Sequence, residues 1–245
     1  MAAMDLSQVA ERLAALRPAS GTYIIGVTGA VAAGKTVFAA ALAEHLAAAG
    51  EKVELVCTDG FLFSNARLAE LDLSNQKGFP PSYDHAALRA ALESVRREPT
   101  AFPGYSHVTY DIDAGLARTL DPPDILIIEG LNLIPTHGPS LIDSLIYLDA
   151  PEYDLEAWYT ARFMSLWEAA EHDPASFYAR FRNMSRAETE GLARMVWEKV
   201  NLKNLHDHIL PARDQADLVV RKGPGHQILA VEARAEVQSA RPPPR

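Results

Sequence analysis

The sequence contains a single cysteine, Cys57, so no disulfide can form within its 245 residues. Disulfides belong to oxidising compartments, and we therefore expect a cytoplasmic protein. No apolar run approaches the roughly 20 residues that cross a bilayer. The first 17 residues carry Asp5 and Glu11 and have no continuous apolar stretch. The sequence thus predicts neither a membrane span nor a secretion signal.

Basic residues are also scarce, with 23 Lys and Arg against 32 Asp and Glu and a formal net charge of -9. Nucleic acids and anionic membranes bind to basic faces, so we expect neither as a partner. The expected ligand is a small molecule bound by locally concentrated cations. The length suits one α/β domain over residues 1–245, with an N-terminal helix in 1–20 and a loose tail over 234–245.

Short apolar runs alternate with helical patterns along the chain. We expect strands at residues 22–27, 53–57, 124–128, 145–148, 217–221 and 227–231. Helices are expected at 5–16, at 37–49, at 84–97 with Asp84 as N-cap, and over most of 153–208 with a break near Asp173-Pro174. Unbroken apolar strands that alternate with helices predict a central, mostly parallel sheet covered by helices on both faces, a three-layer α/β sandwich. The glycine-rich pattern at residues 29–36, directly after the first of these strands, indicates the sandwich of P-loop NTPases.

The pattern G-x-x-x-x-G-K-[ST] follows the first predicted strand and opens the next helix. Its residues are Gly29, Ala30, Val31, Ala32, Ala33, Gly34, Lys35 and Thr36. The glycines let consecutive backbone N–H groups point at phosphates, and the helix adds the positive end of its dipole. Lys35 reaches the β- and γ-phosphates, and the Thr36 hydroxyl ligates Mg²⁺. The pattern predicts a site for ATP and Mg²⁺.

Other P-loop classes carry further signatures that the chain lacks. We find no D-x-x-G switch with an N-K-x-D reader, as in GTPases, and no L-S-G-G-Q motif, as in ABC-type ATPases. A phosphotransferase acting on a small molecule remains.

Two acids follow predicted strands, where ligands of such sheets bind. Asp59 ends the strand after the P-loop helix and suits the base that accepts the proton of the acceptor hydroxyl. Glu129 ends an Ile-Leu-Ile-Ile run and suits the acid that positions Mg²⁺. Arg162, within the helical segment 158–163, is a candidate for stabilising charge on the transferred phosphoryl group.

Several blocks in order resemble the bacterial type I pantothenate kinases, relatives of phosphoribulokinase and uridine kinase. The resemblance runs from about Tyr23 to Ala233. Beside the P-loop, its markers are Thr58-Asp59-Gly60-Phe61-Leu62, Lys77-Gly78-Phe79-Pro80, Ser82-Tyr83-Asp84, Tyr105-Ser106-His107, Tyr110-Asp111, residues 124–132 (D-I-L-I-I-E-G-L-N), Trp158-Tyr159, Arg162-Phe163, Asp173-Pro174, Trp197, Asn204-Leu205, Ile209-Leu210-Pro211 and Arg213.

The resemblance implies roles for the matching residues. Asp59 would deprotonate the primary hydroxyl of pantothenate, and Arg162 would stabilise the transferring phosphoryl group. The pantothenate site would be lined by Tyr105, His107, Tyr110, Tyr159 and Asn204. Lys222 and His226 would lie against the adenine. The family resemblance also implies a homodimer.

Departures from the family pattern leave part of the function open. This chain begins its sheet by Thr22, without the several dozen residues that precede it in family members, so nucleotide preference is open. An arginine implicated in feedback by coenzyme A is replaced by Ala40, and aromatic positions over the substrate tail read Leu166 and Glu171. We expect weak or absent coenzyme A feedback. A nucleoside or sugar-like polyol kinase of the same fold, or a regulator without catalysis, remains as an alternative.

Overall fold

The computed structural model describes residues 6–135 and 138–234. The expected loose tail therefore lies outside the described residues except for Arg234. The helices are α1 (Leu6–Leu16), α2 (Lys35–Ala48), α3 (Asn65–Glu70), α4 (His85–Ser94), α5 (Glu152–Ala169), α6 (Arg186–Val196), α7 (Leu202–Asn204) and α8 (Pro211–Gln215). The strands are β1 (Tyr23–Gly29), β2 (Val53–Cys57), β3 (Thr100–Phe102), β4 (Tyr105–Ser106), β5 (Asp111–Ile112), β6 (Arg118–Leu120), β7 (Ile125–Glu129), β8 (Ser144–Asp149), β9 (Leu218–Lys222) and β10 (Ile228–Ala233).

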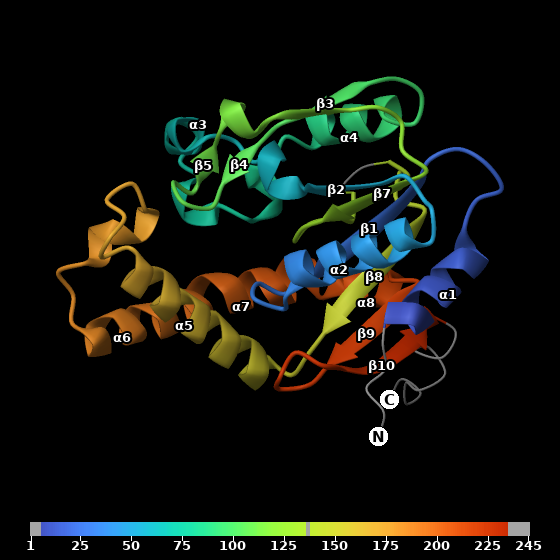
Figure 1. Cartoon of the computed structure of the whole chain (residues 1–245). Coiled ribbons are helices and arrows are strands. Elements are labelled where there is room, and N and C mark those ends of the chain that lie inside the picture. Colours follow the sequence, from blue (N-terminus) through green and yellow to red (C-terminus); the bar gives the residue numbers. More distant parts are fainter. Residues whose placement is uncertain (1–5, 136–137, 235–245) are drawn as a thin grey trace.

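The main sheet has six strands in the order β10-β9-β8-β1-β7-β2 (Figure 1). All neighbouring strands in it are parallel except β10, which pairs antiparallel with β9. β1 and β7 are buried along their whole length, as expected for continuous apolar runs in a covered parallel sheet. The predicted fold class is confirmed.

Helices cover both faces of this sheet. α2 packs against β1, β2 and β7, and α1 packs against α2 and β10. Successive residues of a strand point to opposite faces. Glu129 of β7 contacts Thr36 of α2, whereas the preceding Ile128 faces α4. α4 therefore lies on the face opposite α2.

Outside the main sheet, the chain builds further structure from short strands and helices. β3 pairs with β6 and β4 pairs with β5, both antiparallel. The opposite wall is formed by α5 and by the segment from α6 to α8, which contains π-helical turns at Trp197–Asn201 and Leu205–Ile209. Figure 1 shows α5, α6 and the β4–β5 hairpin extending to the same side of the sheet.

The six strands expected from the sequence are all present, each shifted by at most two residues at an end. Asp84 caps α4 as predicted, because its carboxylate accepts a hydrogen bond from the Ala87 amide. The short strands β3 to β6, helix α3 and the π-helical turns were not anticipated. Among the described residues, no helix is long and apolar enough to cross a membrane.

Candidate active site

The P-loop runs from β1 into α2, and two of its glycines are required by their surroundings. Gly29 has φ +145°, and a Cβ there would lie 2.6 Å from the Leu148 carbonyl oxygen. Gly34 has φ +80°, and its Cβ would lie 2.7 Å from Lys222 Nζ. A side chain at either position would collide with these neighbours and strain the backbone of the loop. This geometry suits a phosphate bound by backbone N–H groups.

Lys35 folds back over the loop that precedes it. Its Nζ donates to the carbonyl oxygens of Ala30 at 2.9 Å and Gly29 at 3.2 Å. Burial lowers the pKa of Lys35, while the charges of Glu129 and Asp59 raise it. In this position the hydrogen bonds of the buried ammonium go to neutral carbonyl oxygens. A phosphate bound by the loop would stabilise the ammonium by adding a negative charge next to it.

Glu129 ends β7 and lies level with Cys57 of β2 and Val27 of β1 in the parallel registers. Its side chain is buried, and its Oε1 accepts a hydrogen bond of 2.9 Å from Thr36 Oγ1. A hydroxyl and a carboxylate side by side are the hard oxygen donors that Mg²⁺ takes together with phosphate oxygens. The pair therefore fits the ion that the family fold implies.

Asp59 lies on a 3₁₀ turn, Thr58–Phe61, that follows β2 directly. Burial raises its pKa, and the nearby charge of Glu129 raises it further. The opposing charges come from His107, Lys35 and Lys77. The structure thus brings together the predicted base and the predicted metal-binding acid, at the carboxyl ends of neighbouring strands.

Lys222 and His226 lie beside the P-loop. Lys222 Nζ donates to the Ala33 carbonyl at 2.8 Å and lies 3.4 Å from His226 Nδ1. Burial, followed by the charge of Lys35, lowers the pKa of Lys222 to about 8. The His226 ring stacks on Trp158 with centroids 3.9 Å apart, and Trp158 Nε1 donates to the Pro224 carbonyl. The result is a flat aromatic surface next to the phosphate cradle.

Arg162 extends from α5 as an exposed side chain. Its charge is among those that lower the pKa of Lys35. The structure therefore places the predicted cation close enough to Lys35 for their charges to interact.

The hairpin of β4 and β5 carries three of the predicted acceptor-site residues. Tyr105 lies with its ring centroid 5.1 Å from that of His107 and 6.3 Å from that of Tyr110. Tyr110 has φ +56°, which turns the chain between the two strands. Lys77 Nζ lies 5.2 Å from the Tyr105 ring centroid and bonds to the Tyr110 carbonyl.

Tyr110 joins the hairpin to an aromatic cluster on the helical wall. Its ring stacks on Phe177 at 4.8 Å, and its hydroxyl lies 3.1 Å from that of Tyr178. Tyr159 packs against the same cluster and against Trp197. Burial raises the pKa of Tyr159 to about 12.

Leu166 and Glu171 supply no aromatic ring to the helical wall, but the wall still carries several rings. Leu166 packs against the cluster, and Glu171 is exposed beyond the end of α5. The rings come instead from residues that the sequence analysis did not assign: Trp167, Phe177, Tyr178 and Phe181. Their signal was the spacing of Phe177, Tyr178 and Phe181 just after Asp173-Pro174.

Asn204 lies between the two π-helical turns, a distortion frequent at functional sites. Its Nδ2 donates to the Gly78 carbonyl at 2.9 Å, and Asn132 Nδ2 donates to the same oxygen at 2.7 Å. The Oδ1 atoms of both asparagines are buried without a hydrogen-bond partner among the described residues. Two buried acceptors of this kind mark a place where ligand donors would be favourable.

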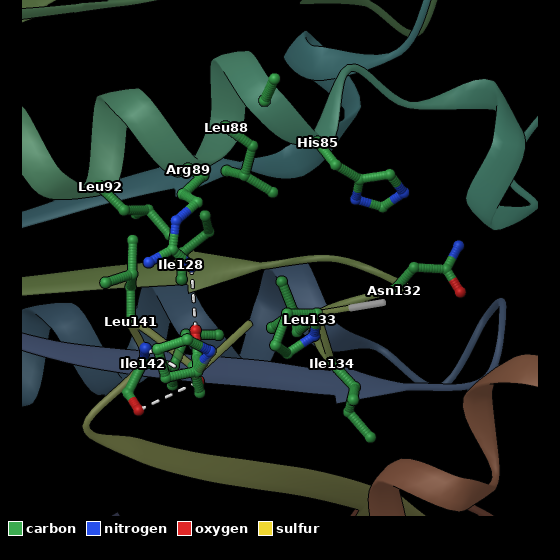
Figure 2. Close-up of a pocket in the computed structure, with 14 residues that line it drawn as sticks. His85, Leu88, Arg89, Leu92, Ile128, Asn132, Leu133, Ile134, Leu141 and Ile142 are labelled. Carbon is green, nitrogen blue, oxygen red and sulfur yellow. Dashed lines mark hydrogen bonds between the residues drawn. The ribbon is translucent and has the colours of Figure 1, made fainter. Parts of the chain in front are cut away.

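A cavity of about 330 Å³ lies between α4 and the loop that follows β7. Figure 2 shows His85 and Asn132 at one end of it and Leu92, Leu141 and Ile142 at the other. Arg89 donates to the Pro139 carbonyl and so ties that loop to α4. The cavity borders the Asn132 side of the site and lies on the face of the sheet opposite α2.

Lys77 and Asn132 belong to motifs that carry the family resemblance, but the sequence predicted no role for either residue. The structure places Lys77 among Tyr105, Tyr110 and the charge of Asp59, and Asn132 beside the Asn204 amide. Both belong to short motifs, K-G-F-P and E-G-L-N, whose contacts depend on loops that fold back from distant parts of the chain.

Residues 24–159 match the Phosphoribulokinase / Uridine kinase family. The chain is 42% identical over 227 residues to a pantothenate kinase of Rhizobium meliloti (strain 1021), covering 86% of this chain and 69% of that protein. It is 40% identical over 249 residues to a pantothenate kinase of Bradyrhizobium sp. (strain ORS 278), covering 95% and 78%.

A solved structure, the D-glycerate 3-kinase from Cryptococcus neoformans var. grubii serotype A, superposes with a TM-score of 0.64. It covers 93% of this chain and 96% of that chain at 13% sequence identity, a likeness of fold alone. The match over residues 24–159 spans the P-loop, Asp59, Glu129 and Tyr159. The chain therefore belongs to the phosphoribulokinase/uridine kinase family.

Proposed function

We propose that this protein is an ATP- and Mg²⁺-dependent kinase that phosphorylates the primary alcohol of pantothenate to give 4′-phosphopantothenate. The observation that carries the proposal is the convergence of Lys35, Asp59 and Glu129 at the carboxyl edge of the sheet, facing a wall of aromatic and amide side chains. The pantothenate kinase relatives, at about 40% identity over most of the chain, support the choice of acceptor.

The donor half holds the nucleotide. The backbone N–H groups of the P-loop and Lys35 bind the phosphates, while Trp158 and His226 offer a flat surface for the base. Thr36 and Glu129 would hold Mg²⁺, which neutralises charge on the phosphate oxygens when bound. Lys222, bonded to the Ala33 carbonyl, keeps a second cation under the loop.

Asp59 then accepts the proton of the acceptor hydroxyl. Burial and Glu129 raise its pKa, so the carboxylate is more basic than an exposed one and better matched to a neutral reaction medium. The hydroxyl oxygen attacks the terminal phosphorus of ATP in line as its O–H bond breaks. The bond between that phosphorus and the bridging oxygen breaks in the same step, and ADP leaves. Arg162 stabilises the charge on the transferred group.

The acceptor half would bind the rest of pantothenate. Tyr105, His107 and Tyr110 reach it from the hairpin, and Tyr159 from α5. Asn204 Oδ1, buried and without a described partner, suits a hydroxyl or amide N–H donor of the substrate. Lys77, close to Asp59 and Tyr105, adds a positive charge to a site whose ligand carries a carboxylate.

A second acceptor class, a nucleoside or sugar-like polyol, is favoured by one observation. Leu166 and Glu171 stand where the family pattern has aromatic residues over the substrate tail, so the wall lacks an aromatic ring at both positions. Because these side chains would contact the acceptor, a change in their shape can favour binding of a different alcohol.

The test is a coupled ADP-release screen of initial rates with pantothenate, uridine, cytidine and ribulose 5-phosphate. We expect the highest kcat/KM with pantothenate. A higher kcat/KM with either nucleoside or with the sugar phosphate would reject pantothenate as the acceptor. ADP release with none of them, despite ATP binding, would instead favour a regulator.

A further inference from the structure

The motif Ser82-Tyr83-Asp84 contains two residues with evident structural tasks. Ser82 Oγ accepts from the Gly78 amide at 2.9 Å and donates to the Phe79 carbonyl at 2.7 Å, which fixes the loop that carries Gly78. Asp84 caps α4. Tyr83, between them, is only 5% exposed, and its hydroxyl lies beside the Thr58 side chain and the Asp59 carboxylate.

The backbone holds Tyr83 against the turn that carries Asp59. Phe63 N donates to the Ser82 carbonyl at 2.9 Å, and Asp84 N donates to the Phe61 carbonyl at 2.8 Å. These two bonds flank an antiparallel bridge between Leu62 and Tyr83. Because these bonds tie the two neighbours of Tyr83 to Phe61 and Phe63, just after Asp59 in the chain, the main chain fixes the position of Tyr83 relative to Asp59.

The Tyr83 hydroxyl donates to Asp59 Oδ1 at 3.5 Å. This is long for an O–H···O bond, but hydrogen bonds of catalytic groups are often long before substrate binds and shorten in the complex. The strongest electrostatic effects on Asp59 come from charged groups: Glu129 from β7, Lys35 from α2, Lys77 from the loop before α4 and His107 from the hairpin. Tyr83 differs from them as a neutral donor held in a fixed direction.

We propose that Tyr83 is a positioning residue that holds Asp59 Oδ1, so that the other carboxylate oxygen faces the acceptor hydroxyl. This inference rests on the proposed role of Asp59 as the base. The proton moves from the acceptor hydroxyl to the free oxygen of Asp59, and Tyr83 keeps its own proton throughout. Its hydroxyl stabilises the ionised carboxylate and restricts its rotation.

The test is Tyr83→Phe, which keeps the ring and removes only the hydroxyl. We expect kcat to fall about tenfold, a modest share of what general-base catalysis contributes, with KM for ATP unchanged. Loss of a donor to the carboxylate raises the pKa of Asp59. Since the base must be ionised, the acid limb of the kcat–pH profile should move to higher pH.

Tyr23→Phe is the matched control. Tyr23 is equally buried, and its hydroxyl bonds to the Leu13 carbonyl and Ser144 Oγ at the far end of β1. We expect this variant to lose thermal stability while keeping kcat and its pH profile. A purely structural role for Tyr83 would give the same pattern in Tyr83→Phe.

The inference is overturned if Tyr83→Phe keeps the wild-type kcat and acid limb while Asp59→Asn is inactive. If Asp59→Asn itself keeps its turnover, the base is another residue and the proposed mechanism fails first. The two failures are therefore separate. Measuring both variants with the best acceptor from the ADP-release screen keeps the test independent of the choice of pantothenate.

Discussion

The donor and acceptor halves of the site are built in different ways. The phosphate-binding part of the donor half comes from one continuous segment, Gly29–Thr36, next to Glu129 of the neighbouring strand. Trp158, Lys222 and His226 complete the donor half beside this segment. The acceptor half is assembled from the Gly78 loop, the β4–β5 hairpin, α5 and the π-helical segment around Asn204. In the proposed mechanism the donor half binds ATP, a ligand common to many enzymes. The acceptor half determines which alcohol is phosphorylated.

The largest effect should come from the residue where the two halves meet. Asp59→Asn keeps the size of the side chain but removes the base, and we expect kcat to fall at least about a hundredfold. ATP binding, measured by calorimetry, should stay close to that of the wild type because the P-loop is untouched. Unchanged turnover would place the base elsewhere.

The Asn204→Leu variant should weaken binding of the acceptor without affecting binding of ATP. The variant removes both the bond to Gly78 and the buried Oδ1, so we expect KM for the acceptor to rise about tenfold or more, as for a lost polar contact of ~1.4 kcal/mol. KM for ATP should not change in the same steady-state assay. Asn132→Leu, which breaks the other bond to the Gly78 carbonyl, should act in the same direction.

A rise in KM for ATP in Asn204→Leu would contradict the separation of the halves. Equal effects on both substrates would mean that Asn204 supports the site as a whole.

The affinity for ATP should depend on pH because of Lys222 in the donor half. Burial and the charge of Lys35 lower the pKa of Lys222 to about 8. The ammonium loses its proton as pH rises through that value, so affinity for ATP should fall between about pH 7 and 9. Lys222→Arg, which stays charged, should show a flatter dependence. Calorimetric titrations across this range distinguish the two proteins, and identical slopes would mean that the charge of Lys222 does not contribute to ATP binding.

The smallest effect is expected from coenzyme A. Ala40 replaces an arginine that the family resemblance connects with feedback, and α2 presents no cation at that position. Coenzyme A titrated into the steady-state assay should change the rate little. Strong inhibition competitive with ATP would show that feedback survives without that arginine.

The same contrast explains how much could be predicted from the sequence. The P-loop, Asp59 and Glu129 were found because their chemistry depends on local order: a glycine pattern and acids that directly follow apolar strands. Lys77 and Asn132 were not given roles, because their contacts depend on loops that meet from distant parts of the chain. The aromatic cluster was missed for the same reason, since Phe177 and Tyr178 reach Tyr110 only after the hairpin and α5 come together.

The central claim is that a general donor half serves an acceptor half built for pantothenate. The most direct measurement is ³¹P and ¹H NMR of the product formed from ATP and pantothenate. We predict ADP and one new phosphomonoester, coupled to the protons of the primary carbinol carbon. A reaction in which ATP and pantothenate persist unchanged, while another alcohol is phosphorylated under the same conditions, would contradict the claim.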